Sequence, residues 1–115
     1  MNNTTLLYRL REYLTQNATG RTNAVTIGKL YYMTGAERRT IERLTEQLRD
    51  EGMPLCSAVR MEPRGMYIAQ TKDEAREYTQ AIWSRCKKMM RRIGLTNAAL
   101  DEIETKYGKQ LEMQI

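Results

Sequence analysis

The sequence has no histidine and no phenylalanine, and it has only two cysteines and two prolines among 115 residues. Histidine is the commonest general acid–base in enzymes because its proton dissociates near neutral pH. A glycine-rich phosphate loop and the GxSxG and HExxH motifs are also missing. The acidic residues sit among Arg and Lys at helical spacing, as on a solvated helix face. We therefore predict that the protein is not an enzyme.

The two cysteines, Cys56 and Cys86, lie far apart in the sequence. The usual zinc site needs about four Cys or His ligands, which two distant thiols and no histidine cannot supply. A disulfide would need an oxidising compartment, to which nothing in the sequence points. We expect two reduced, partly buried thiols, and neither a metal nor a cofactor.

Long hydrophobic runs are missing as well. The segment from Ile27 to Met33 is among the longest, and Gly28 and Lys29 interrupt it. A membrane-spanning helix needs about 20 apolar residues. The first five residues contain no basic region followed by an apolar core, so they do not resemble a secretory signal. We expect no membrane contact and a cytoplasmic protein.

What the sequence does contain is positive charge and enough apolar residues to fold. The net charge is +5, with 41% hydrophobic and 29% charged residues. This composition is typical of a folded domain, and the basic balance mildly favours a polyanionic partner. We expect one domain over residues 1–70, followed by a C-terminal helical extension over residues 71–115.

Apolar residues at steps of three and four predict three helices in the first half of the chain. The first follows an N-cap at Thr5. The second is capped by Thr26 and ends near Gly35, because glycine readily adopts the left-handed conformation that ends a helix. The third covers about residues 37–51 and ends before Gly52. The residues expected to face inward are Leu6, Leu7, Leu10, Tyr13, Leu14, Ile27, Leu30, Tyr31, Ile41, Leu44 and Leu48.

The periodicity then changes to that of strands. Residues 55–61 and 65–70 contain strand-forming residues such as Val59, Tyr67 and Ile68, and the segment Glu62–Gly65 between them reads as a turn. These segments predict a β-hairpin. The fold class is therefore mostly α with a small β-hairpin, and three helices followed by a hairpin is the order of a winged helix-turn-helix.

A capping box, Thr71 to Glu74, predicts the start of the longest helix, which we expect to end at Gly94. Thr96 would cap a last helix, with fraying from Gly108 onwards. The apolar residues of these helices exceed what a small three-helix core can cover. A second copy of the protein could cover the remainder, which predicts a homodimer formed through the C-terminal helices. The methionines could equally mark a surface for another protein.

Four stretches carry a resemblance to a known family: Thr26–Leu30, Thr34–Ile41, Leu48–Leu55 and Arg64–Tyr67. They resemble bacterial winged helix-turn-helix regulators, and are similar to the N-terminal DNA-binding domain of biotin repressors. In that family a short helix, a glycine-containing turn and a recognition helix lead into an L-R-x-x-G sequence and a hairpin. The resemblance covers about residues 6–69 and implies a DNA-binding regulator. Glu37 and the wing end at Arg64–Tyr67 depart from the family's pattern.

Burying Ile41, Leu44 and Leu48 turns Arg39 and Arg43 away from the core. Helix-turn-helix proteins present the N-terminal half of this helix to the major groove, where an arginine can donate two hydrogen bonds to guanine. Arg38 lies on the flank, and Thr40 could contact a phosphate. Alternatively, residues 37–51 form a solvated face, because their four arginines are matched by five acidic residues.

Other basic residues extend the candidate DNA surface. The wing adds Arg60 and Arg64, which could reach a groove or a phosphate or could belong to an ordinary charged turn. Lys29 and Arg21 flank the helix-turn-helix and could touch phosphates. The densest basic run could grip phosphates or an acidic partner, or could only solubilise the helix; it comprises Arg85, Lys87, Lys88, Arg91 and Arg92.

Two functions remain open from the sequence. The first is a bacterial or phage transcription regulator that binds double-stranded DNA. The second is a winged-helix adaptor or inhibitor that binds another protein, for example a phage or mobile-element protein acting on a host factor. The acidic C-terminal half of the third helix and the methionine-rich extension favour the second.

Overall fold

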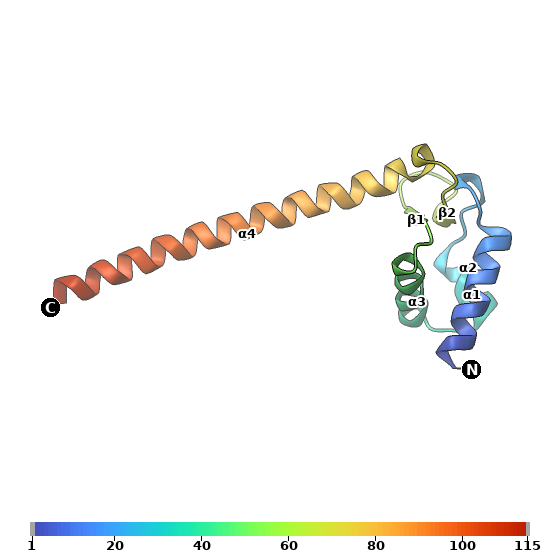
Figure 1. The fold of residues 1–115 in the computed structure, drawn as a ribbon, viewed down its shortest axis with the longest axis horizontal. Coiled ribbons are helices and arrows are strands. Elements are labelled where there is room, and N and C mark those ends of the chain that lie inside the picture. Colours follow the sequence, from blue (N-terminus) through green and yellow to red (C-terminus); the bar gives the residue numbers. More distant parts are fainter. Residues whose placement is uncertain (1, 115) are drawn as a thin grey trace. The chain divides into compact units, whose positions relative to one another are not determined.

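The computed structural model describes the backbone of residues 2–114 and the side chains of residues 2–108. It is mostly helical, with a two-stranded antiparallel hairpin and a long C-terminal helix (Figure 1). The chain divides into two units, Met1–Thr79 and Gln80–Ile115. In chain order the elements are α1 (Asn3–Asn17), the 3-10 helix η1 (Arg21–Asn23), α2 (Ile27–Thr34), α3 (Arg38–Asp50), β1 (Leu55–Ala58), β2 (Gly65–Ile68) and α4 (Lys72–Gln114).

Helix α1 begins earlier than the sequence predicted. Its N-cap is Asn2, whose side-chain oxygen accepts a hydrogen bond of 2.9 Å from the backbone N–H of Thr5. The prediction of Thr5 as the cap was wrong because an Asn three residues ahead caps at least as well as a Thr. The apolar stripe was predicted correctly, since Leu6, Leu10 and Leu14 are buried.

Helices α2 and α3 are joined by a short turn whose chemistry the sequence predicted. The hydroxyl of Thr26 caps α2 by accepting from the N–H of Lys29, and Gly35 ends it in the left-handed conformation with φ +71°. In α2, Leu30 is buried, but Tyr31 is 54% exposed and not inward-facing as expected. A helix of only two turns has one narrow buried stripe, and Leu30 occupies it.

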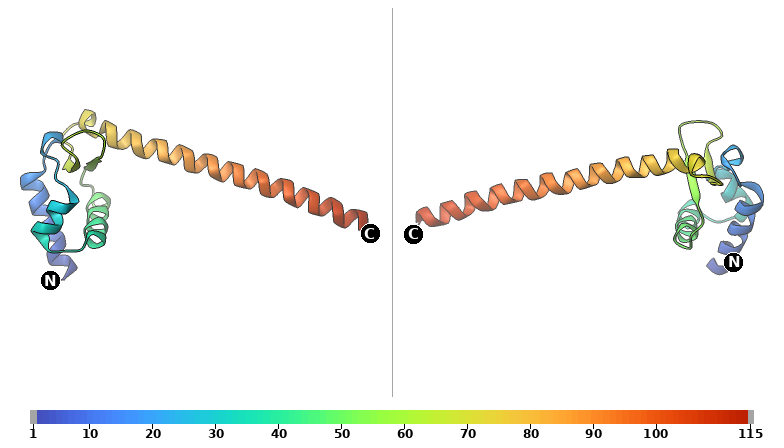
Figure 2. Two further views of the ribbon diagram at one scale, coloured as in Figure 1. Left: turned by 180° about the vertical axis from the view of Figure 1, so that it is seen from behind. Right: turned by 45° about the horizontal axis from the view of Figure 1, so that its top comes forward.

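Strands β1 and β2 pair antiparallel, with Leu55 opposite Ile68 and Ala58 opposite Gly65. Both strands are shorter than predicted: β1 ends at Ala58 because residues 59–64 form the connecting loop, and β2 begins at Gly65 as predicted but ends at Ile68 (Figure 2). The segment between α1 and α2 also joins the hairpin, since Val25 forms an antiparallel bridge with Met66. Gly65 is required there, because a Cβ at this position would overlap the backbone of Val25 and its φ is +128°.

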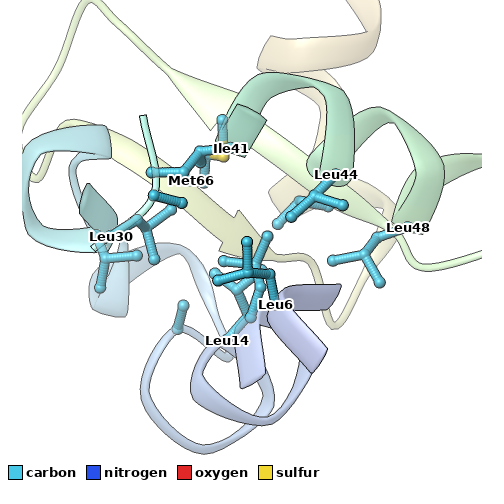
Figure 3. Packing of buried hydrophobic residues seen from close by; sticks show 12 residues of the cluster. Leu6, Leu14, Leu30, Ile41, Leu44, Leu48 and Met66 are labelled. Carbon is cyan, nitrogen blue, oxygen red and sulfur yellow. The ribbon is translucent and has the colours of Figure 1, made fainter. Parts of the chain in front are cut away.

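The main core gathers the inner faces of α1, α2 and α3 against β2 (Figure 3). Its members are Leu6, Leu10, Leu14, Ala18, Val25, Leu30, Ala36, Ile41, Leu44, Leu48, Leu55 and Met66. Ile41, Leu44 and Leu48 all lie in it, which confirms the predicted inner edge of α3. This face of α3 is therefore fixed, and its opposite face is set by the helix period.

A second, smaller cluster lies on the hairpin. It consists of Cys56, Ala58 and Tyr67, with Ala75 and Tyr78 from the start of α4 packed against it. The hydroxyl of Tyr67 donates a 2.6 Å hydrogen bond to the backbone oxygen of Glu74. The first two turns of α4 are thus attached to the hairpin.

Helix α4 runs from Lys72 to Gln114 without interruption, so the predicted end at Gly94 and the predicted cap at Thr96 were wrong. Gly94 does not have positive φ. A glycine inside a helix costs about 1 kcal/mol relative to alanine, but it does not end the helix without a left-handed turn. The predicted fraying from Gly108 is also not observed, since the helix continues through this residue.

Candidate nucleic-acid interface

The N-terminal half of α3 presents its arginines to solvent. Arg39 and Arg43 are both exposed, and neither takes part in an ion pair among the described side chains. They lie opposite the buried edge of the helix, as its period of 3.6 residues requires. The structure therefore places these two predicted residues together on one accessible face.

Arg38 and Thr40 flank this pair. The Nε atom of Arg38 donates to Oε1 of Glu42 at 3.1 Å, across one helical turn. Exposed pairs of this spacing contribute only about 0.3–0.5 kcal/mol, so Arg38 can exchange the carboxylate for a phosphate at little cost. Thr40 is half-buried beside the core.

The C-terminal half of α3 differs because its basic residue is turned inward. Arg49 donates from Nε to the backbone oxygen of Leu55 at 2.8 Å and from Nη2 to Oγ of Ser57 at 3.1 Å. Its guanidinium also lies 5.2 Å from the ring centre of Tyr78. Glu46 and Asp50 stay exposed. The positive charge of α3 is thus concentrated at its N-terminal end.

Thr45 is a buried residue of α3 that the sequence analysis missed. It is 1% exposed, and its hydroxyl donates a 2.8 Å hydrogen bond to the backbone oxygen of Glu42. A threonine beside Leu44 gave no apolar signal, but the hydrogen bond within the helix removes the cost of burying its hydroxyl.

The loop between β1 and β2 carries two of the predicted residues. Arg60 is exposed, and so are the apolar side chains of Val59 and Met61 on either side of it. Arg64 is exposed and lies 3.3 Å from the carboxylate of Glu62. Among the described residues, no hydrogen bond or ion pair joins these arginines to α3.

The guanidinium of Arg21, which the sequence analysis considered for a phosphate contact, is occupied within the protein. It donates from Nη1 to the backbone oxygen of Pro63 at 2.6 Å and from Nη2 to that of Met61 at 2.8 Å. It also lies 5.4 Å from the ring centre of Tyr67. An arginine with these partners is a structural residue, and it holds the loop that carries Arg60 and Arg64.

Glu74 organises the base of the same loop. The predicted capping box is half-correct, because the N–H of Glu74 donates to Oγ1 of Thr71 at 3.2 Å. The Glu74 carboxylate, however, accepts from the backbone N–H of Gln70 at 2.7 Å and of Arg21 at 2.9 Å. The bonds from Arg21 and then Gln70 hold the pKa of Glu74 below its usual value of 4.5, because they favour the ionised carboxylate.

Lys29 lies on the exposed side of α2. The same helix exposes three large side chains, with Tyr31 54%, Tyr32 84% and Met33 51% accessible. The sequence analysis expected Tyr31 in the core and assigned no role to the other two. These residues make α2 the most apolar exposed part of the first unit's helices.

The basic run of α4 lies in the second unit. Its five members, Arg85, Lys87, Lys88, Arg91 and Arg92, are all exposed. Lys87 lies 6.0 Å from the ring centre of Trp83, which is itself 60% exposed. No ion pair among the described side chains includes any of the five.

The cysteines differ in their surroundings. Cys56 is buried in the hairpin cluster, and burial raises the pKa of its thiol, which keeps it neutral. Cys86 is exposed on α4, so the expectation that both thiols are partly buried was wrong for this one. Within the described part of the chain, no group of three or more His, Cys, Asp or Glu residues is arranged to hold a metal ion.

None of the described helices is apolar over a stretch long enough to cross a bilayer. Comparisons with models of known protein families, with curated proteins and with solved structures found no match to this chain. The resemblance to winged-helix regulators therefore stays one of sequence motifs, and the functional argument depends on the surfaces described above.

Proposed function

We propose that the first unit is a winged helix-turn-helix domain that binds double-stranded DNA, as part of a transcription regulator of bacterial or phage type. The order of its elements supports this proposal: three helices, a hairpin, and a bridge from Val25 that adds the segment before α2 to the hairpin. The observation that carries it is the exposed arrangement of Arg39 and Arg43 at the N-terminal half of α3, where neither forms an ion pair with another described side chain. That half is the part of a recognition helix that enters the major groove.

The chemistry of these two residues suits the role. Each guanidinium can donate two parallel hydrogen bonds to O6 and N7 of guanine, or can pair with a phosphate. Arg38 and Thr40 would contact the backbone next to them. The acidic residues Glu46 and Asp50 lie further along α3, where the helix would leave the groove.

The loop between β1 and β2 would serve as the wing. Arg60 and Arg64 would contact phosphates or the minor groove, and Lys29 would contact a phosphate from α2. Arg21 gives the loop a defined position by binding the backbone oxygens of Met61 and Pro63. An ordered wing lowers the entropic cost of binding.

Affinity for random-sequence duplex DNA, measured by fluorescence anisotropy over a salt series, tests the proposal. The affinity should fall steeply as salt rises, because bound arginines and lysines release counterions from the phosphates. The double variant Arg39→Ala/Arg43→Ala should bind at least about tenfold more weakly, since each contact to a charged group is worth roughly 1–3 kcal/mol.

A charge-matched control separates this site from a general effect of net charge. The variant Arg9→Ala/Lys72→Ala also removes two exposed positive charges, from α1 and from the start of α4. It should keep most of the affinity. Equal losses in the two double variants would contradict a site on α3.

A second function, an adaptor that binds another protein, is favoured by one observation. Tyr31, Tyr32 and Met33 form an exposed aromatic and methionine surface on α2, of the kind enriched at protein interfaces. If the protein binds no DNA even at low salt, this function replaces the first. The variant Tyr32→Ala should then bind the partner protein more weakly than wild type.

A further inference from the structure

The second unit exposes an apolar seam along α4, which Thr96 interrupts near its middle. Its positions recur at alternating steps of four and three residues, which is the heptad repeat of a coiled coil. One set of heptad positions contains Cys86, Ile93, Leu100 and Tyr107, and the other contains Ile82, Met89, Thr96 and Ile103. Polar residues, Thr79 and Gln110, take the next heptad positions at the two ends of the seam.

This seam is open to solvent. Met89 is 60%, Ile93 62%, Leu100 50%, Ile103 60% and Tyr107 62% exposed. Most helical stability in proteins comes from packing of an apolar face rather than from helix propensity, and the propensity of α4 is lowered by Gly94 and Gly108. A helix of this kind obtains its stability from packing, so the seam requires a partner.

Charge is distributed unevenly about the middle of the seam. Residues 85–92 contain five basic and no acidic residues, whereas residues 97–104 contain three acidic and no basic residues. The midpoint of the seam, which extends from Ile82 to Tyr107, lies between Gly94 and Leu95. A two-fold axis through this midpoint would place each basic segment beside the acidic segment of a second copy.

We propose that α4 forms an antiparallel two-stranded coiled coil with a second copy of this chain. In this register Ile82 meets Tyr107 of the second copy, Cys86 meets Ile103, and Met89 meets Leu100. At the middle, Ile93 meets Thr96. Two kinds of layer, Ile82 with Tyr107 and Met89 with Leu100, therefore pair two large apolar side chains, and the Cys86 layer pairs a small apolar side chain with Ile103.

The charges on the two flanks of the seam also match in this orientation. Lys87 lies on the same flank as Asp101 and Glu104 of the second copy, and Arg85 and Lys88 lie on the same flank as Glu102. Lys106 is the exception near Arg85, and it already pairs with Glu102 of its own chain at 3.3 Å. A parallel arrangement would instead place residues 85–92 of the two copies side by side, with like charges along both flanks.

The proposal places the contact of the expected homodimer on the seam of α4 and makes the two helices antiparallel. It does not depend on DNA binding. The mass of the full chain in solution, measured by sedimentation equilibrium without DNA, should be that of a dimer. Leu100→Lys should give a monomer, because it puts a charge into a buried layer. Ala98→Lys, which adds the same charge two residues away on the outer face, should remain a dimer. A monomeric wild-type protein at every concentration tested would overturn the proposal.

Disulfide formation tests whether the two α4 helices pair antiparallel or parallel. In a Cys56→Ala background, the further variant Ile103→Cys should form bonds between Cys86 and position 103 of the second copy under mild oxidation. Those two positions lie about 25 Å apart within one helix, so a bond between them can form only between copies. Without Ile103→Cys, Cys86 should stay reduced. A bond joining Cys86 to Cys86 of the second copy would show a parallel pair and overturn the proposal.

Failure of the coiled-coil proposal can be told apart from failure of the DNA-binding proposal. Leu100→Lys leaves the first unit unchanged, so its monomer should still bind random duplex DNA through α3, though more weakly because each molecule then offers one recognition helix. A dimer that binds no DNA would keep the coiled coil and refute only the nucleic-acid function.

Discussion

The two units of the chain contain the same kinds of large apolar side chain but bury them to very different extents. In the first unit Leu10, Leu30 and Leu48 are at most 1% exposed, whereas in the second unit Leu95, Leu100 and Ile103 are at least 50% exposed. The first unit is stabilised by its own core. Both units are helical and both have periodic apolar residues. The burial of an apolar side chain therefore depends on what packs against its helix, and the periodicity alone does not determine it.

The largest expected effect comes from removing a core side chain of the first unit. Leu48→Ala should lower the free energy of unfolding by roughly 2–5 kcal/mol, because it removes a fully buried side chain and leaves a cavity. Leu95→Ala, on the outer side of α4, should change it by less than about 0.5 kcal/mol. Urea unfolding of both variants measures the difference. Similar losses in the two would contradict the comparison between the units.

A smaller loss is expected when the loop between β1 and β2 loses its anchor. Arg21→Ala should cost about 1–3 kcal/mol, because the backbone oxygens of Met61 and Pro63 lose their charged donor. Limited proteolysis within residues 59–64 should become faster. Arg60→Ala, in the same loop but exposed, should leave both the stability and the cleavage rate nearly unchanged.

A helix-stabilising change should act on the second unit alone. Gly94→Ala replaces a glycine in the interior of α4 and should favour the helix by about 1 kcal/mol. Circular dichroism during heating should show the helical signal of α4 retained to higher temperature. The thermal transition of the hairpin cluster, followed by the nuclear magnetic resonance signals of Tyr67, should not move. If the thermal transitions of α4 and of the hairpin cluster shift by the same amount, the two units unfold together.

The weakest effect is one of pH. The pKa of Glu74 is lowered in the folded protein, so the ionised carboxylate stabilises the fold above the usual value of 4.5, and this contribution is lost as pH falls through the lowered pKa. Glu74→Gln should therefore be less stable than wild type at neutral pH, and the gap should narrow in acid below pH 4.5. If the difference in stability between wild type and Glu74→Gln stays constant with pH, the charge of the Glu74 carboxylate does not contribute to stability.

Local chemistry allowed much of the first unit to be predicted from the sequence. The inner edge of α3, the cap at Thr26 and the left-handed Gly35 are all confirmed, because each depends on residues within one helix or turn. The hairpin was predicted with its position correct but its strands too long. The end of β1 depends on the loop from residue 59 to residue 64, which is held by Arg21 from a distant part of the chain.

The predictions were wrong where the same residue type can take either of two structural roles. Gly94 was taken to end a helix, but glycine does so only when it adopts positive φ, and here α4 continues. Arg21 was considered for a phosphate contact, yet its partners are the backbone oxygens of Met61 and Pro63, about 40 residues further along the chain. Tyr31 has the correct helical spacing for the core, but the inner stripe of α2 is occupied by Leu30, which is buried, and by Ile27, which is partly buried.

The exposed face of α3 was the part of the candidate site that the sequence located best, because it follows directly from the buried face. Which ligand this face binds does not follow from its periodicity, since Arg39 and Arg43 would be exposed on any solvated helix.

Nuclear magnetic resonance of the isotopically labelled protein tests the nucleic-acid claim most directly. On addition of short duplex DNA at low salt, the backbone N–H signals of residues 38–43 should shift most, followed by those of residues 59–64. If the signals of α3 stay in place while DNA shifts only those of other segments, or shifts none, then α3 is not the recognition helix.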